Sequence, residues 1–419
     1  MDVTARTGTA VEPTDEPAGE PVRALTGIDL LAPTWGRGVP HDQFDRLRRE
    51  APVYRHHEPD GPGFWAITKH ADVRRVSHDW KTFSSELGGT FIPTADEETL
   101  AQLRLTILNM DPPKHHRARR LISKAFTPRM ISKLTEDIEA RAELVIDEVI
   151  ERGECEFVEE IAAQVPVQMI CEMIGLEREL WPRMFEISND LIGSRDDPEY
   201  AHVNSNEASA EIFMLCDAVA ADRRVTPRDD LMTALVHAEI DGERLDNTDL
   251  NLFFVTLVVA GNETTRNLIN HSLLALLDHP EQAEQLRSQP ELWQSAVEEM
   301  LRWGSSIHNF RRTATRDTEI RGMAIAAGDK VVLYYASANR DEEVFEDPHR
   351  FDITRTPNDH VAFGGGGVHY CLGASLARAE IRATMRQVVE RLVNIELTSA
   401  PERLKNDFVN GIKRMHVRW

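Results

Sequence analysis

The sequence predicts a mainly α-helical protein with small β-sheets. Helical patterns of apolar residues fill most of the chain beyond about residue 70, and one of them is long enough to cross the whole protein. Short runs rich in β-branched and aromatic residues stand near the N-terminus and again towards the C-terminus. No repeat with a period of about 20 to 50 residues is visible, which argues against a solenoid.

The strands are expected in four places. Residues 51–58 and 64–69 form two β-type runs, and the turn-rich segment Pro59–Gly63 between them predicts a hairpin connection. Further strands are expected at 330–335 and in the stretch after Asp407. These runs are too short and too few for a β protein, so the sheets should be small.

The longest predicted helix lies in the second half of the chain. The run Asp246–Asp249 offers several candidates to cap its start, and it should run to about Asp278, ending before His279, which precedes a proline. At 1.5 Å per residue this helix would span roughly 50 Å. Its middle, 253–260, is apolar on nearly all sides and is therefore expected to be buried.

Length and composition predict the domain organisation. The chain has 419 residues, and we expect a single domain over 23–419. Residues 1–22 are rich in Thr, Pro, Glu and Gly and are expected to form a disordered tail. The four cysteines show no short metal-ligand spacing and no disulfide framework, which fits a reducing, cytoplasmic location.

The charge pattern limits the partners. The net charge of −22 argues against a nucleic-acid partner, and the lack of any apolar stretch of about 18 residues argues against an integral membrane anchor. One stretch after Pro112 is basic and has no acidic residue, so it is either a solvated helix face or a docking site for an acidic partner. Its basic residues are Lys114, Arg117, Arg119, Arg120, Lys124, Arg129 and Lys133.

The most informative segment is the run FGGGGVHYCLG, from Phe363 to Gly373. Its four consecutive glycines allow the backbone to pass close to a flat ligand. The residues after Cys371 read as a helix, and the free N–H groups at a helix start would favour a thiolate there over a thiol. One interpretation is a metal-binding thiolate, and the other is a buried structural cysteine in a Gly-rich turn.

A second unusual segment, Ala260–Thr265, interrupts the apolar middle of the long helix with an amide, an acid and two hydroxyls. One explanation is structural: Gly261 permits close packing, and Thr264 bonds back to the carbonyl four residues earlier. The other explanation is functional and depends on a family resemblance.

Both segments, in this order, resemble motifs of the cytochrome P450 family. The Gly-rich run resembles the family's haem-ligand loop, and Ala260–Thr265 resembles its oxygen-binding motif; the resemblance extends from about Asp111 to the C-terminus. It implies the cytochrome P450 fold, with haem between the long helix and the cysteine loop. One departure concerns Phe363, which stands eight residues before the cysteine, whereas the usual family spacing is seven. A subset of bacterial members that act on sterols, terpenoids and branched lipids resembles this chain in having the longer spacing.

The resemblance implies roles for single residues. Cys371 would bind the iron of haem b, Thr264 would hydrogen-bond the iron-bound peroxo group, and Glu263 would relay protons from solvent. The two haem propionates need cationic or hydrogen-bonding partners. The further residues expected to bind the cofactor are His115, Arg119, Ala260, Arg312 and His369.

A pair of charges in another helix also matches the family. Glu299 and Arg302 lie three apart on one helical face, and as a surface pair they would contribute only about 0.2 to 0.5 kcal/mol. The family instead has a buried Glu-x-x-Arg pair joined by a further arginine, for which Arg350 is the expected match. By this resemblance the three residues are structural and hold the loop that presents the cysteine.

The predicted function is a haem-dependent monooxygenase that uses O2 to hydroxylate a hydrophobic small molecule, of terpenoid, sterol or branched-lipid type. Electrons would come from a ferredoxin and a ferredoxin reductase, because no dinucleotide fingerprint or flavin module is apparent in the chain. A haem-thiolate peroxygenase, an oxidative-coupling enzyme and a non-catalytic haem sensor are the alternatives. The expected pocket walls are 90–94, 187–193, Val259, Ala260, Ile307, His308 and Val409.

Overall fold

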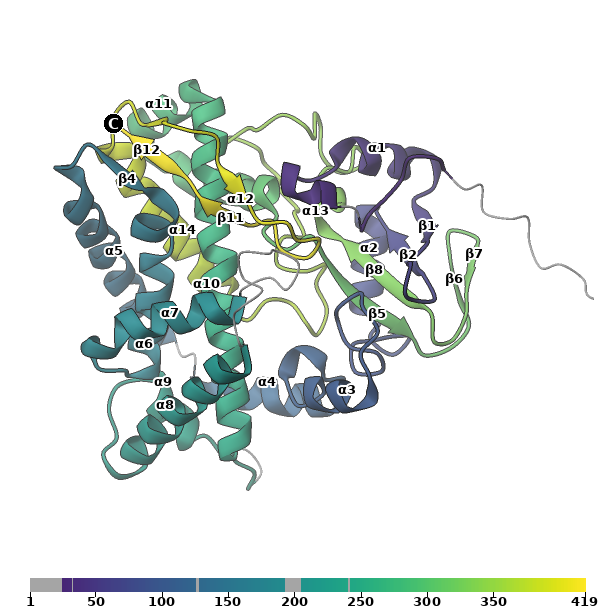
Figure 1. Cartoon of the computed structure of the whole chain (residues 1–419), viewed down its shortest axis with the longest axis horizontal. Coiled ribbons are helices and arrows are strands. Elements are labelled where there is room, and N and C mark those ends of the chain that lie inside the picture. The colour runs from purple at the N-terminus through teal and green to yellow at the C-terminus, as the bar shows by residue number, and fades with distance from the viewer. Residues whose placement is uncertain (1–24, 32, 126–127, 193–204, 240–241) are drawn as a thin grey trace, which may run out of the picture.

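The computed structural model describes residues 25–31, 33–125, 128–192, 205–239 and 242–419 (Figure 1). The tail expected at residues 1–22 lies outside these ranges. The predicted fold class is confirmed: helices make up most of the described chain, and the sheets are small. No helix in the described ranges is both long and apolar enough to cross a membrane.

The α-helices follow the chain in this order: α1 His41–Glu50, α2 His70–His78, α3 Glu97–Leu103, α4 Lys114–Ala125, α5 Pro128–Ile150, α6 Gln164–Ile174, α7 Trp181–Ile192, α8 Ser205–Val225, α9 Leu231–Val236, α10 Asn247–Asp278, α11 Pro280–Ser288, α12 Trp293–Gly304, α13 Tyr335–Ala338 and α14 Ala374–Arg391. In Figure 1, α10 runs through the whole molecule, with most helices on one side and the largest sheet on the other.

The strands are β1 Val53–His56, β2 Phe64–Ile67, β3 Phe83–Ser84, β4 Glu154–Glu156, β5 Asn309–Ala314, β6 Thr318–Ile320, β7 Met323–Ile325, β8 Lys330–Tyr334, β9 Glu396–Leu397, β10 Glu402–Arg403, β11 Ile412–Arg414 and β12 His416–Arg418. The largest sheet has the order β1-β2-β8-β5-β3. β1 and β2 pair as the predicted hairpin, β8 lies parallel to β2, and β5 lies antiparallel to β8.

Helix α10 has the predicted bounds because its start is capped. The Asp246 carboxylate accepts a hydrogen bond from the Asp249 N–H at 2.7 Å, and the Asp249 carboxylate accepts one from the Asp246 N–H at 3.2 Å. The helix packs against α6, α8, α12 and α14. The expected burial of 253–260 holds only in part, because Phe253, Phe254 and Val258 are buried whereas Ala260 is exposed.

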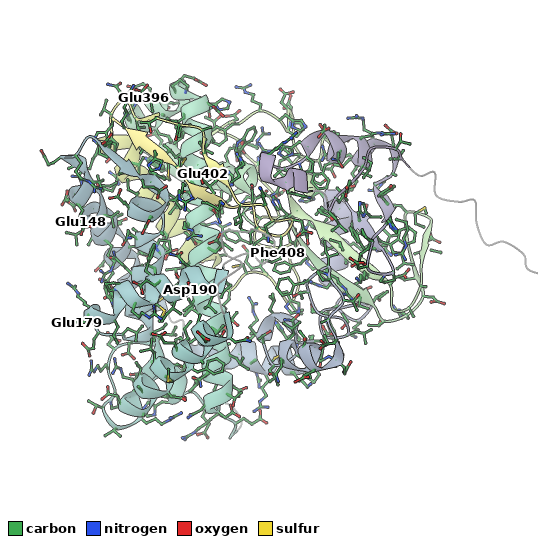
Figure 2. All side chains as sticks on the ribbon, in the orientation of Figure 1. Glu148, Glu179, Asp190, Glu396, Glu402 and Phe408 are labelled. Atoms are coloured by element: carbon green, nitrogen blue, oxygen red, sulfur yellow. The ribbon has the colours of Figure 1, made fainter. Side chains whose placement is uncertain are left out.

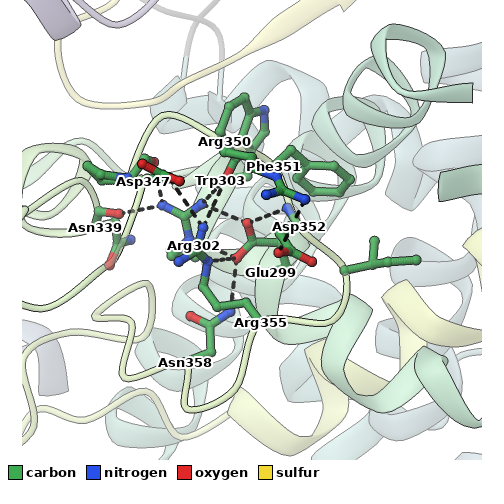
Figure 3. A network of polar contacts seen from close by, with 12 residues as sticks. Glu299, Arg302, Trp303, Asn339, Asp347, Arg350, Phe351, Asp352, Arg355 and Asn358 are labelled. Carbon is green, nitrogen blue, oxygen red and sulfur yellow. Dashed lines mark hydrogen bonds and ion pairs between the residues drawn. The ribbon is translucent and has the colours of Figure 1, made fainter. Parts of the chain in front are cut away.

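The pair Glu299 and Arg302 is fully buried, as the family resemblance implies (Figure 3). Arg302 donates to both Glu299 carboxylate oxygens, at 2.8 and 2.7 Å. The prediction that Arg350 joins them through its side chain is wrong. The Arg350 guanidinium is 67% exposed, and only the Arg350 carbonyl accepts from Arg302. The side chain that joins the pair is Arg355, whose Nε lies 3.2 Å from a Glu299 oxygen.

Candidate active site

Cys371 lies in a loop that ends directly before α14. The Cys371 N–H donates to the Phe363 carbonyl at 3.1 Å, and the Tyr370 N–H donates to the Gly367 carbonyl at 3.3 Å. These bonds fold the Gly-rich run back on itself, so that the cysteine is presented at the helix start. The Cys371 side chain is exposed, whereas the other three cysteines are buried. The alternative of a buried structural cysteine therefore does not fit this residue.

Although the Cys371 side chain reaches solvent, the protein atoms around it raise the pKa of its thiol because they disfavour the charged form. A hydrogen bond from the Gly373 N–H and the charges of Arg119 and Arg378 act in the opposite direction, as expected at a helix start. The sequence-based expectation that the helix start makes the thiolate the favoured form is therefore wrong for the free side chain. A coordinated metal ion removes this proton outright, so the site still suits a metal.

The glycines of the loop are needed for packing on α2. A Cβ on Gly365 would lie 2.6 Å from the Ser77 hydroxyl, and Cβ atoms on Gly366 and Gly367 would collide with His78 and the Ser77 main chain. Gly366 also has a φ of +94°. The nearest neighbours of these glycines are thus residues of α2. The sequence predicted that the glycine backbone passes close to a flat ligand, and the close neighbour seen in the structure is helix α2.

The four predicted propionate partners come together beside the cysteine loop. The rings of His115 on α4 and His369 have centroids 4.4 Å apart, and the charges of Arg312 and Arg119 both act on His369. Arg119 also donates to the Val368 carbonyl at 3.3 Å. Segments that lie far apart in the sequence therefore meet beside the loop.

These groups fit a cofactor that carries carboxylates. Burial and the nearby cations lower the pKa of His369 to about 2 and that of His115 to about 4, so both rings are neutral at pH 7. His115 Nδ1 is buried without a hydrogen-bond partner. In the described ranges no carboxylate forms an ion pair with Arg119 or Arg312, which donate to main-chain carbonyls. A haem propionate would supply the carboxylate partner that these two arginines lack.

Asn262 and Glu263 in the α10 segment both form side-chain hydrogen bonds, Asn262 to helix α7 and Glu263 within α10 itself. The Asn262 amide donates to the Ser188 hydroxyl on α7 at 2.9 Å. Glu263 is buried and accepts from Asn267 at 2.6 Å and from Arg266. The Glu263 carboxylate is thereby satisfied, whereas Asn262 Oδ1 is buried without a hydrogen-bond partner.

Ala260, Gly261 and Thr264 also behave as the structural explanation predicts. The Thr264 hydroxyl donates to the Ala260 carbonyl at 2.6 Å, and a Cβ on Gly261 would lie 3.2 Å from Ile170 Cδ1 on α6. Yet Ala260 is exposed and Thr264 is only half-buried, one turn apart on the same face of α10. Because both residues are accessible, the structure leaves room for a functional role of Thr264, which stays a prediction.

Two polar partners were not apparent from the sequence. The Ser85 hydroxyl lies 3.2 Å from His369 Nε2, and Thr265 hydrogen-bonds Glu380 on α14. Burial raises the pKa of Glu380 to about 8. The Thr265–Glu380 contact ties the oxygen-motif segment of α10 to the helix that follows Cys371. No local spacing signal connects these residues, because each pair is joined only by tertiary packing.

The basic stretch lies on α4 and the start of α5. Lys114 pairs with Glu86 at 2.9 Å and Arg117 with Glu243 at 2.5 Å, so part of its charge is compensated within the protein. Arg119 turns towards the cysteine loop, and Arg120 is exposed. The side chains of Lys124, Arg129 and Lys133 lie outside the described residues.

Two of the predicted pocket segments pair with each other. Ile307 and Val409 form a β-bridge, and the His308 N–H donates to the Phe408 carbonyl at 2.8 Å. The His308 ring is fully buried and lies 4.3 Å from the Trp35 ring, so this side chain faces the core and is a wrong choice as a pocket wall. Thr90 is likewise buried and hydrogen-bonded to Asn109.

Comparisons with known proteins agree with this site. The cytochrome P450 family matches residues 166–418. A steroid C26-monooxygenase of Mycobacterium tuberculosis is 39% identical over 405 residues, covering 94% of this chain and 93% of the relative. A methyl-branched lipid omega-hydroxylase of the same organism is 42% identical over 388 residues, covering 90% of each.

A solved structure is similar over nearly the whole chain. The structure of a Mycobacterium marinum cytochrome P450 in complex with pseudoionone superposes with a TM-score of 0.87 at 38% identity, covering 95% of this chain and 100% of that one. The resemblance proposed from two sequence motifs therefore extends to the fold. The chain belongs to the cytochrome P450 family and is a haem-dependent monooxygenase.

Proposed function

We propose that this cytochrome P450 hydroxylates an apolar lipid of sterol, terpenoid or methyl-branched type at the branched end of its chain. The observation that carries the proposal is the similarity to a steroid C26-monooxygenase and to a methyl-branched lipid omega-hydroxylase at about equal identity. Both names describe attack at the far end of an apolar chain. The offset of Phe363 from Cys371, which is expected for lipid-hydroxylating bacterial members, supports the same class.

A row of aromatic rings supports an apolar substrate. The Phe310 ring lies 6.2 Å from Tyr335 and 5.2 Å from Phe408, which in turn lies 5.0 Å from Phe91. Phe310 and Arg312 are two residues apart on β5 and so point to one face of the sheet. Figure 2 shows Phe408 between α10 and the largest sheet. These rings would form an apolar wall beside the cofactor.

The proposed roles of the site residues follow from their chemistry. Haem, when bound, supplies the iron at which oxygen is activated. Cys371 would hold it through Sγ, and His115, Arg119, Arg312 and His369 would hold its carboxylates. Ala260 would leave room beside it because its side chain is small.

Glu263 and Thr264 would deliver protons. A polar cavity of about 190 Å³, lined by Glu263, Arg266, Asn189 and Glu159 among others, adjoins α10 and can hold several water molecules. Glu263 would take protons from this water, and the Thr264 hydroxyl would place them at the reacting oxygen. For this, Thr264 Oγ1 must rotate away from the Ala260 carbonyl.

We further propose a ferredoxin with its reductase as electron donors, and a cytoplasmic location, which the four free thiols support. The basic face of α4 would attract an acidic ferredoxin, although Glu86 and Glu243 weaken it. Lys114 and Arg117 side chains are still 67% and 50% exposed, so they remain accessible for such docking.

A turnover assay tests the substrate and the donors together. With ferredoxin, reductase and NADPH, a methyl-branched fatty acid and a sterol with a branched side chain should induce a high-spin shift and be hydroxylated at the terminal methyl. A straight-chain acid and a macrolide serve as comparisons. Equal turnover with hydrogen peroxide alone would favour the peroxygenase alternative. Binding of the macrolide only would overturn the substrate class and leave the enzyme class intact.

A further inference from the structure

Arg378, one turn into α14, contacts one residue of α12 and two residues of the cysteine loop. Its Nε and Nη2 donate to the two oxygens of Glu298 on α12, at 2.6 and 2.8 Å. Its guanidinium carbon lies 4.5 Å from the centre of the Phe363 ring, within the range of a cation–π contact. It also hydrogen-bonds Tyr370, and its charge acts on Cys371.

Glu298 is itself held from a second side. His360 Nε2 lies 3.0 Å from a Glu298 oxygen. Burial alone would raise the pKa of Glu298, but the hydrogen bonds from Arg378 and His360 lower it to about 2. The carboxylate is therefore ionised at pH 7, and it fixes the position of the guanidinium. Arg378 and Glu298 form a pair of opposite charges of which the arginine is the nearer to the thiol.

Phe363 connects this pair to the metal ligand. Its carbonyl accepts the Cys371 N–H at 3.1 Å, and its ring packs against the Arg378 guanidinium and lies 6.2 Å from the centre of the Tyr370 ring. The ring is thus held by the guanidinium while its main chain holds the cysteine. A displacement of Arg378 would be transmitted to Cys371 through Phe363 and through Tyr370, which Arg378 also hydrogen-bonds.

We propose that Arg378 is a positioning residue for Cys371 and that the Arg378–Glu298 pair sets the reduction potential of the iron bound there. The inference rests on the proposed binding of haem by Cys371. A positive charge beside the ligand favours the more electron-rich ferrous state, and a negative charge favours the ferric state. Removing one partner leaves the other uncompensated, so the two single changes should have opposite effects.

Spectroelectrochemical titration of the haem-loaded enzyme measures this potential. Arg378→Gln should shift the ferric–ferrous equilibrium about tenfold towards ferric, and Glu298→Gln about tenfold towards ferrous, each about 59 mV for one electron. Arg378→Lys keeps the charge and should stay close to the parent potential. Arg386→Gln is the matched control, because Arg386 lies on the same helix in an exposed pair with Glu390 and should change nothing.

Shifts of the same sign in Arg378→Gln and Glu298→Gln, or no shift, would overturn the inference, because a purely structural role gives no sign difference. If Arg378→Gln loses haem, the other two variants test the inference. It then requires a shift towards ferrous in Glu298→Gln and a reduction potential close to that of the parent in Arg378→Lys. The carbonyl spectrum of the parent enzyme tests haem binding by Cys371 separately from the role of the Arg378–Glu298 pair. A parent without a thiolate-type spectrum refutes haem binding by Cys371, whereas a normal spectrum with unchanged potentials refutes only the role of the pair.

Discussion

Glu299→Ala should destabilise the folded protein by about 3 to 5 kcal/mol and abolish stable haem binding, because it leaves buried cations without their carboxylate. Glu299 is fully buried and accepts five hydrogen bonds: two from Arg302, and one each from Arg355, the Asn358 amide and the Asp352 N–H. No rearrangement of the surrounding loop can replace so many contacts. Urea unfolding and haem content of the purified variant measure the effect.

A pair of arginine variants makes this test specific (Figure 3). Arg355→Ala should lose much of the same stability, since its guanidinium contacts Glu299 and the carbonyls of Glu346 and Arg350. Arg350→Ala should lie within about 0.5 kcal/mol of the parent, as exposed side chains usually do. Equal losses in the two variants would contradict the assignment of Arg355 as the third member.

Thr264→Ala should keep haem and substrate binding but divert electrons from product to released hydrogen peroxide. Proton transfer by a positioned group typically contributes about 100-fold to 10,000-fold, so product formation should fall strongly while electron consumption continues. Glu263→Gln should slow both together, because it interrupts the supply of protons. The measurement is product formed and peroxide released per electron consumed.

Thr256→Ala is the matched control for this prediction. Thr256 lies on the same helix and its hydroxyl also bonds back, to the Leu252 carbonyl at 2.7 Å, so its loss removes the same type of hydrogen bond two turns away. It should leave coupling unchanged, and Thr264→Ser should restore most of it. Full coupling in Thr264→Ala would contradict the proposed role in proton delivery. The Thr264 hydroxyl would then serve only the helix, through its bond to the Ala260 carbonyl.

The features that could be predicted from the sequence are those encoded locally. The bounds of α10 follow from the Asp246 cap and from the proline after His279, and the β1–β2 hairpin follows from its turn residues. The Cys371 loop followed from its glycines and the helix behind it. Each of these signals lies within a few residues of the element that it specifies.

The features that were missed depend on tertiary packing. Arg350 and Arg355 both carry the right charge, and only the course of the loop decides that Arg355 reaches Glu299. The glycine contacts with α2 and the raised pKa of the Cys371 thiol likewise follow from what surrounds the loop in three dimensions. The position of the cysteine at a helix start could be predicted, whereas the electrostatic environment of its thiol could not.

The ferrous carbonyl spectrum tests the central claim, that Cys371 is the thiolate ligand of haem. The parent enzyme should give the red-shifted Soret band of a thiolate complex. Cys371→His should lose that band, while Cys216→Ala, which removes a buried cysteine on α8, should keep it. A red-shifted band that survives in Cys371→His, or is missing from the haem-loaded parent, would contradict the account.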